Sequence, residues 1–332
     1  MKWLEDGQKF AVIGLDLAQE DDCQVHCFGS ELLALGPEEF EMDELWRQWI
    51  GSIRTEDIQE FGLLLVAKKS SETPKVMDAE NQELLSIVGN WMMGLTLARS
   101  YWTYRSGYQA TGSKVNGQLD VRTFGEIASP ARAIVVDDQP ITTNQLKTAA
   151  SIGENLGKFV RAWKNEDCRL RRCLAIYQSA RNSNDILDRI HQFVRCVEGL
   201  ILPEQGQTKQ RFKGKTELFI GPKHHSLMDK LYTVRSAVEH MNDHTLLGAA
   251  DRESRLEIAK LESSIEYIAR TALSRIILSP QLAEYFSDIE TLEKFWALDL
   301  GDRKELWGEV VNPSDAFAYF DFDRVTNNDL GL

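Results

Sequence analysis

The chain has 332 residues, of which 43% are hydrophobic and 27% are charged, and its formal net charge is −13. This length is enough for two ordinary domains, each with its own core. The excess of acidic residues argues against a general nucleic-acid coat protein, because phosphates would be repelled over most of the surface. The charge still allows a small basic patch that binds RNA locally.

No run approaches the roughly 18 apolar residues that a membrane span needs. The acidic start, Met1 to Asp6, lacks the apolar segment of a signal peptide, so we expect a cytoplasmic protein that does not bind membranes. The five cysteines are an odd number at wide spacings, which argues against a disulfide framework. Cys23, His26 and Cys27 could be half of a zinc site, but the alternating pattern around them favours a strand with reduced cysteines.

The first half of the chain alternates between strand-like and helix-like patterns, which predicts a mixed α+β domain. Strands are expected at residues 9–16, 24–28, 61–67 and 133–136, with 24–28 pairing with 9–16. Helices are expected from Gly36-Pro37 through Ile50 and from Asp78 to about Tyr104. Residues 106–132 carry spaced glycines and predict turns and short strands.

Beyond Thr142 the pattern is helical nearly throughout. Helices are expected at residues 143–163, 168–180, 186–202, 207–219, from about 225, at 252–278 and at 281–298. Pro203, Gly221-Pro222 and Pro280 separate them, because proline ends a helix. The chain therefore divides into an α+β domain at 1–165, an all-α helical bundle at 166–290 and an acidic, aromatic extension at 291–332, and is mostly helical overall.

The helix expected over residues 227–244 carries the most informative side chains. At about 100° per residue, one stripe would face the core: Leu227, Leu231, Val234, Val238 and Met241. His240 lies roughly 130° from the centre of that stripe and Ser236 lies opposite it, so both should point away from the core. Arg235 flanks the stripe and can reach outward.

Simpler roles are open to the same residues. Arg235 can pair with Glu239, four residues later, and His240 can be an exposed side chain near a helix end, where a cation is favourable. His240 and His244 also have the i, i+4 spacing that a metal could use, but no acidic or sulfur partner is obvious. We expect neither a metal nor a cofactor.

The order Arg235-Ser236-Ala237-Val238-Glu239-His240, placed on the fourth helix of a helical domain, resembles the HEPN superfamily. Residues 168–279 as a whole look like a HEPN domain of the ApeA-like group. The likeness includes the segments Phe193–Leu200 and Gln210–Lys215. In one departure, relatives often place a glycine straight after the histidine, where this chain has Met241.

The resemblance implies a metal-independent endoribonuclease that cuts tRNA or other single-stranded RNA in a prokaryotic toxin or anti-phage defence system. His240 would move protons, because histidine titrates near pH 7. Arg235 would stabilise the phosphate charge, and Ser236 would orient His240 or a phosphate oxygen. Two protomers would pair so that both copies of the motif line one cleft.

Two alternatives remain open. An inactive HEPN domain could serve as a binding or dimerising subunit of a larger complex, which the missing glycine after His240 favours. The second alternative is an all-α interaction protein without nucleic-acid chemistry, in which Arg235 and Glu239 would only form an ion pair.

Four basic residues within seven positions form a candidate track for the RNA backbone: Lys209, Arg211, Lys213 and Lys215. A solvated loop explains these residues equally well. Phe212 and Tyr232 could stack on bases, although packing in the core is the simpler role for both. The expected partners are RNA, a second copy of the chain through the helical domain, and a regulatory or phage-derived protein at the N-terminal domain.

Overall fold

A computed structural model of the chain describes residues 2–20, 22–27, 29–42, 44–133, 139–162, 168–202, 208–242, 251–318 and 322. The chain forms two compact units. The sheet unit comprises Met1–Ser129 with Asp137–Ala162, and the helical unit comprises Pro130–Val136 with Trp163–Leu332. Residues 291–332, predicted as an extension, belong to the helical unit.

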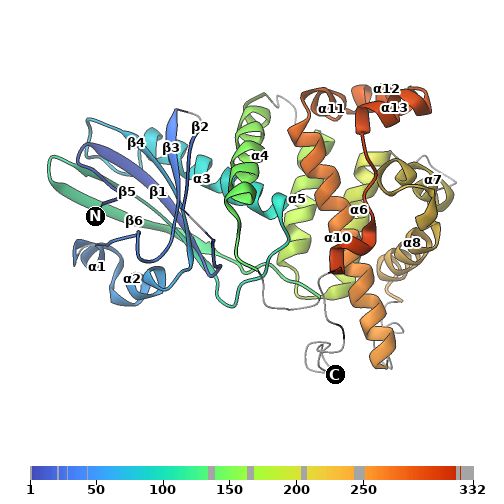
Figure 1. The fold of residues 1–332 in the computed structure, drawn as a ribbon, viewed down its shortest axis with the longest axis horizontal. Helices are drawn as coiled ribbons and strands as arrows, with labels where there is room; N and C mark the ends of the chain where they lie inside the picture. Colours follow the sequence, from blue (N-terminus) through green and yellow to red (C-terminus); the bar gives the residue numbers. More distant parts are fainter. Residues whose placement is uncertain are drawn as a thin grey trace. The chain divides into compact units, whose positions relative to one another are not determined.

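Within the described residues, six strands form one sheet in the order β2-β3-β4-β1-β5-β6 (Figure 1). Every neighbouring pair is antiparallel. The strands are β1 (Gln8–Leu15), β2 (Cys23–Cys27), β3 (Ser30–Leu35), β4 (Leu63–Ser70), β5 (Gly107–Val115) and β6 (Gln118–Ile127). The α+β character predicted for this region is confirmed, and Cys23–Cys27 is a strand as expected.

The predicted pairing of residues 24–28 with 9–16 is wrong. β2 pairs with β3, with Cys27 opposite Ser30, and β1 lies between β4 and β5. Gly29, directly before β3, has φ +70°, a left-handed conformation that glycine adopts without steric cost. A hairpin between segments adjacent in sequence costs little chain entropy, so β2 pairs locally with a strand that the sequence pattern does not reveal.

Helices cover both faces of the sheet (Figure 1). They are α1 (Glu44–Ile50), α2 (Ser52–Gln59), α3 (Ala79–Ala98) and α4 (Thr143–Ala162). On β1, Ala11 and Ile13 pack with residues of α3 and α4, whereas Phe10 and Val12 pack with residues of α1 and α2. Because both faces are covered, residues 10–15 of the central strand β1 form a continuous apolar run. The helix predicted through Ile50 begins only at Glu44, and α2 is a separate helix.

The helices α3 and α4 approach closely at two glycines. A Cβ atom at Gly94 would lie 2.0 Å from the backbone oxygen of Ala149, and one at Gly153 would lie 2.7 Å from that of Asn90. Larger residues would push the helices apart, so these glycines hold the helix pair that covers one face of the sheet.

The helical unit follows the predicted order of helices, with ends that differ by a few residues. They are α5 (Arg169–Asn182), α6 (Ile186–Ile201), α7 (Thr208–Ile220), η1 (Pro222–His224), α8 (His225–Glu239), α10 (Arg252–Leu278), α11 (Pro280–Tyr285), α12 (Ile289–Ala297), α13 (Leu300–Trp307) and η2 (Pro313–Phe317). The helix expected at 281–298 is split, because Asp288 and Thr291 form a capping box that starts α12. Most of the strand predicted at 133–136 and much of the segment 317–323 lie outside the described residues.

A buried charged network joins three helices of the helical unit. Arg189 Nε on α6 donates to Glu262 Oε1 on α10 at 2.8 Å. Tyr177 Oη on α5 donates to Glu266 Oε1 at 2.6 Å, and Arg270 Nε donates to the same oxygen at 3.0 Å. Burial raises the pKa of Glu262, and the adjacent Arg189 opposes that rise. These contacts fix α6 against α5 and α10.

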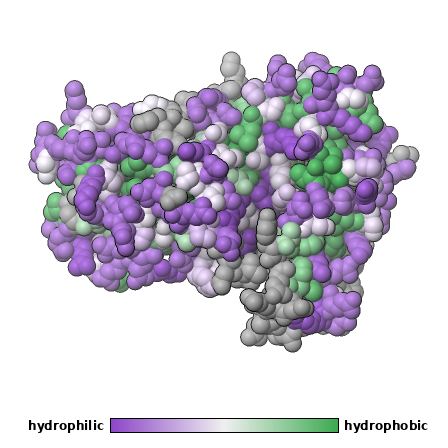
Figure 2. All heavy atoms as spheres, viewed as in Figure 1, coloured by the Kyte–Doolittle hydropathy of each residue, from purple (hydrophilic) through white to green (hydrophobic). Residues whose placement is uncertain are grey.

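The visible surface is hydrophilic over most of its area, and hydrophobic residues gather most densely over the helical unit (Figure 2). Exposed large apolar side chains of that unit include Leu300, Val310 and Met241. Among the helices in the described ranges, none is long and apolar enough to cross a membrane.

Candidate active site

The motif predicted from the sequence lies at the C-terminal end of α8. The helix ends at Glu239, and His240 is its cap residue. Met241 has φ +56°, and the backbone N–H of Asn242 donates to the carbonyl of Ala237 at 2.8 Å, which closes the helix as a Schellman motif does. His240 therefore stands at the tip of a helix rather than within it.

The predicted core stripe of this helix holds for its middle residues, whereas Leu227 and Val238 are only half-buried. Leu231 and Val234 are buried, together with Met228, and His240 is exposed. Met241 is 84% exposed, so its predicted place in the core stripe is wrong. The helix stops two residues earlier, and beyond that point the 100° rotation no longer applies.

Arg235 is half-buried between carboxylates from two helices. Its Nη2 lies 3.4 Å from Glu198 Oε2 on α6, and its Nη1 lies 3.9 Å from Glu239 Oε2 on α8. Its guanidinium also lies 5.9 Å from the ring centroid of Tyr232. The local pair with Glu239 considered from the sequence is present, but the closer contact is the one with Glu198. This contact fixes where the cation sits.

Glu239 has a closer partner than Arg235. His191 Nε2 on α6 donates to Glu239 Oε2 at 2.7 Å. The hydrogen bond from His191 lowers the pKa of Glu239, and the charge of Arg235 adds to that effect. Burial raises the pKa of Glu198, and Arg235 opposes that rise. The two carboxylates beside Arg235 are therefore shifted in opposite directions.

Sequence reasoning missed the contribution of α6. His191, Arg195 and Glu198 follow one another at i, i+4 and i+7, which places them on one side of the helix. The apolar residues of α6 predict its core face, and the same periodicity leaves a polar stripe at these three positions. This polar stripe is the sequence pattern from which these three residues could have been predicted as part of the site. The facing side of α8 supplies Arg235 and Glu239, and we call these five residues the α6–α8 cluster.

Ser236 is half-buried on α8. Its backbone carbonyl accepts from the N–H of His240 at 3.2 Å. Between these two described residues, and between Ser236 and Arg235, no side-chain hydrogen bond is formed. The orienting role of Ser236 stays a prediction.

The basic segment is a helix, α7, and several of its basic side chains contact other parts of the protein. Lys209 and Lys213 lie 3.2 Å and 2.9 Å from Asp229 Oδ1. Lys215 donates to the carbonyls of Ile201 and Leu202, both at 2.9 Å, and so caps the C-terminus of α6.

These contacts give Lys215 a structural role in holding α7 against α6. Phe212 is fully buried, as its simpler role requires, whereas Tyr232 is half-buried. That Lys209, Arg211, Lys213 and Lys215 contact RNA stays a prediction.

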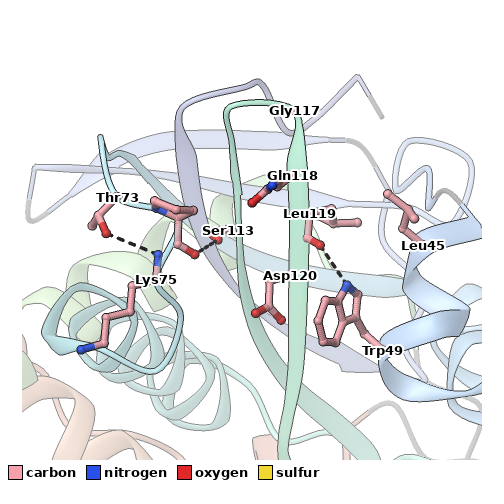
Figure 3. Close-up of a pocket in the computed structure, with 10 residues that line it drawn as sticks. Leu45, Trp49, Thr73, Lys75, Ser113, Gly117, Gln118, Leu119 and Asp120 are labelled. Carbon is pink, nitrogen blue, oxygen red and sulfur yellow. Dashed lines mark hydrogen bonds between the residues drawn. The ribbon is translucent and has the colours of Figure 1, made fainter.

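The sheet unit contains a pocket of about 620 Å³ at the edge strand β6 (Figure 3). It is lined by Leu45, Trp49, Thr73, Pro74, Lys75, Ser113, Gly117, Gln118, Leu119 and Asp120. Trp49 Nε1 donates to the carbonyl of Leu119 at 2.9 Å, and the guanidinium of Arg122 lies 4.2 Å from the indole centroid. Arg122 also binds Asp120, whose pKa is raised by burial. The pocket thus combines an aromatic wall with the carboxylate of Asp120, whereas the ammonium of Lys75 points away from these two side chains (Figure 3).

Within the described ranges, no group of three or more His, Cys, Asp or Glu side chains is placed to hold a metal ion. His244, the partner that a metal at His240 would need, lies outside those ranges.

Comparisons with known proteins give no further guide. The chain matches no family model, no curated protein and no solved structure. The α6–α8 cluster and His240 are therefore the features from which a function can be inferred.

Proposed function

We propose that the helical unit is a metal-independent endoribonuclease of the HEPN type, with its site at the C-terminal end of α8. One observation carries the proposal: an exposed histidine, His240, stands five residues, about 1.4 helical turns, after Arg235, which Glu198 contacts. An imidazole titrates near pH 7 and a guanidinium stays charged. Together they are the two groups that RNA cleavage without a metal requires.

In the proposed reaction the 2′-hydroxyl of RNA attacks the adjacent phosphorus. The O2′–P bond forms, the P–O5′ bond breaks, and the products carry a 2′,3′-cyclic phosphate and a 5′-hydroxyl. His240 takes the proton of the 2′-hydroxyl or supplies the proton of the leaving oxygen. Arg235 stabilises the additional charge on the phosphate oxygens.

A homodimer completes the site in this proposal. One copy of His240 can act as the base and the other as the acid only if two copies of α8 line the same cleft. Two-fold symmetry supplies both from a single motif. Loss of cleavage on dilution below the dimer dissociation constant would support this arrangement.

The sheet unit, in the same proposal, senses a trigger or binds a regulatory protein, as expected of a toxin or anti-phage defence protein. The pocket beside Trp49 is the feature that supports a binding role, because it joins an aromatic wall to charged groups. Trp49→Ala should then reduce the response to the trigger and leave basal cleavage unchanged.

The test is cleavage of total cellular RNA by the full chain in the presence of EDTA. Wild type should cleave and leave 2′,3′-cyclic phosphate ends. Arg235→Ala should lower the rate at least about 100-fold, the loss typical of a group that stabilises transition-state charge. Arg172→Ala, which removes an exposed arginine of α5, is the matched control and should leave the rate unchanged. Cleavage that EDTA abolishes would contradict the proposal.

A second candidate is a HEPN-like subunit that binds and dimerises without cleaving. The observation favouring it is that Arg235 already faces two carboxylates, Glu198 and Glu239, in the resting state. A protein that dimerises while leaving every RNA pool intact would support this candidate.

A further inference from the structure

Arg195 lies on the same side of α6 as His191 and Glu198, which both contact the motif helix. Its spacing from His191 is one turn and its spacing from Glu198 is slightly less than one turn. Arg189, the α6 residue in the buried network, lies about 120° away from Arg195 around the helix at 100° per residue. The helical phase therefore places Arg195 on the side of α6 that contacts α8, and away from the buried network.

Electrostatics agree with this placement. The hydrogen bond from His191 lowers the pKa of Glu239, and the charges of Arg235 and Arg195 add to the effect. Burial raises the pKa of Glu198, and the charges of the same two arginines oppose the rise. Arg195 and Arg235, which come from different helices, thus act on the same two carboxylates.

The guanidinium of Arg195 is half-buried and weakly engaged. Among the described residues its hydrogen bond is to Gln192 Oε1, one turn earlier on α6, at 3.4 Å. A guanidinium has five N–H donors in a fixed fork, and the other donors suit the oxygens of a phosphate. An arginine held near the site with donors to spare is arranged as an anion-binding group.

The cluster also holds buried polar atoms that no described residue satisfies. They are His191 Nδ1, Glu198 Oε1 and Arg235 Nε. The side chain of His191 is 90% buried, since 10% of it is exposed. Buried polar atoms are seldom left without partners in proteins. The Nε–H of Arg235 in particular can donate a hydrogen bond to a phosphate oxygen.

His191 keeps Arg235 available. Because His191 holds Glu239 at 2.7 Å, the Glu239 carboxylate stays 3.9 Å from Arg235, beyond hydrogen-bond distance. Glu198 holds the other edge of the guanidinium only at 3.4 Å. A phosphodiester that brings two charged oxygens can therefore compete for Arg235.

We propose that Arg195 is a second phosphate-binding residue, which grips the same backbone phosphate of single-stranded RNA as Arg235. The assignment rests on the proposed function, because it names the part of the substrate that the same site holds. Arg195 and Arg235 approach that phosphate from α6 and α8, so the substrate bridges the two helices.

The test is binding of a fluorescein-labelled 2′-O-methyl RNA oligonucleotide to the full chain, followed by fluorescence anisotropy over a range of salt concentrations. Without a 2′-hydroxyl the probe cannot be cleaved, so binding is measured apart from catalysis. Arg195→Ala should weaken binding about tenfold, and the slope of log affinity against log salt should fall by up to about 0.7, since Arg235 still contacts the same phosphate. Arg172→Ala should bind as wild type does.

A double-mutant cycle sharpens the assignment. If both arginines grip one phosphate, Arg195→Ala combined with Arg235→Ala should weaken binding by less than the product of the two single effects. Arg195→Lys keeps the charge but loses the fork, so it should retain the salt slope and lose part of the affinity. Arg195→Gln serves as the second variant should the alanine variant not fold.

The binding and cleavage results distinguish the proposed nuclease activity from the phosphate-binding role of Arg195. Wild type that binds the probe, loses binding on Arg195→Ala and yet cleaves no RNA would refute the proposed nuclease while supporting Arg195 as a phosphate ligand. Arg195→Ala or Arg195→Gln that binds with unchanged affinity and salt slope would overturn the Arg195 assignment, whether or not RNA is cleaved. Wild type that does not bind the probe would overturn it as well.

Discussion

Arg189 and Arg195 lie on the same helix, but α6 presents them to different surroundings. Arg189 is buried and donates to Glu262 at 2.8 Å within a network that joins α5, α6 and α10. Arg195 is half-buried, and its charge acts on two carboxylates, Glu198 and Glu239, that already have other partners. A buried charge with a close partner is part of the fold, because leaving it alone would be costly. A half-buried charge with donors to spare is available to a ligand.

The largest effect should come from breaking the buried network. Arg189→Ala leaves the Glu262 carboxylate buried without its cation, so the free energy of unfolding should fall by about 3–5 kcal/mol. Calorimetric unfolding of the full chain should show the loss as a lower transition temperature. Arg195→Ala is the control from the same helix and should cost less than about 1 kcal/mol. Equal losses in the free energy of unfolding for the two variants would contradict the distinction between the buried network and the α6–α8 cluster.

The second effect concerns activity rather than stability. Arg235→Lys keeps a positive charge but cannot offer the planar fork, so the cleavage rate should fall about tenfold or more. The unfolding temperature should stay near that of wild type. Arg172→Lys makes the same chemical change on an exposed face of α5 and should not alter the rate. A fully active Arg235→Lys protein would mean that Arg235 acts only as a distant charge.

A third effect should appear at the end of α8. Met241 has φ +56°, a conformation that costs L-residues other than glycine roughly 1 kcal/mol. Met241→Gly should therefore stabilise the protein by about 1 kcal/mol, measured as a rise in the unfolding temperature, and leave cleavage unchanged. The HEPN domains that the sequence resembles often have glycine at this position, so a gain in stability without a gain in rate would assign that glycine to helix termination. A large gain in rate would contradict this reading.

The smallest effect should be a pH dependence of opposite sign at the two carboxylates of the α6–α8 cluster. Glu198 has a raised pKa, so its contribution to stability is complete below the usual glutamate pKa of about 4.3 and is lost as pH rises through the folded value. Glu239 has a lowered pKa, so its contribution is present above about 4.3 and is lost as pH falls through the folded value.

Urea unfolding of the glutamine variants at pH 4 and pH 7 measures this contrast. Relative to wild type, Glu198→Gln should have a more favourable effect on the free energy of unfolding at pH 7 than at pH 4. Glu239→Gln should cost up to about 0.5 kcal/mol at pH 7, because Glu239 is well exposed, and less at acid pH. Identical pH profiles for the two variants would contradict the assigned shifts.

The sequence predicts local structure well where one physical cause dominates. Hydrophobic period and proline positions place α5, α6, α7, α8 and α10, and the phase of α8 places His240 away from the core. The α+β character of the sheet unit follows from the same reasoning. The end of α8 is less predictable, because Met241 adopts a backbone conformation that methionine disfavours.

Contacts between helices lie beyond that reasoning. Glu198 and His191 reach the motif only because α6 packs beside α8, and no spacing within either helix encodes that pairing. Lys215 belongs to a basic run that suggests RNA, yet it caps α6 through two carbonyls that lie 13 and 14 residues earlier in the chain. The pairing of β2 with β3 is a similar case, since the cost of chain closure decides it.

The most direct test of the central claim compares two exposed histidines at opposite ends of α8. His240 caps its C-terminus, and His225 begins it beside Glu217, with the imidazole and carboxylate 2.6 Å apart. Total RNA is incubated with each alanine variant in EDTA, and the cleavage ends are mapped. If His240 is the catalytic acid or base, His225→Ala should cut as wild type does and His240→Ala should lose at least about 100-fold in rate, within the range of a general acid or base. Equal cleavage by His240→Ala and wild type would contradict this role.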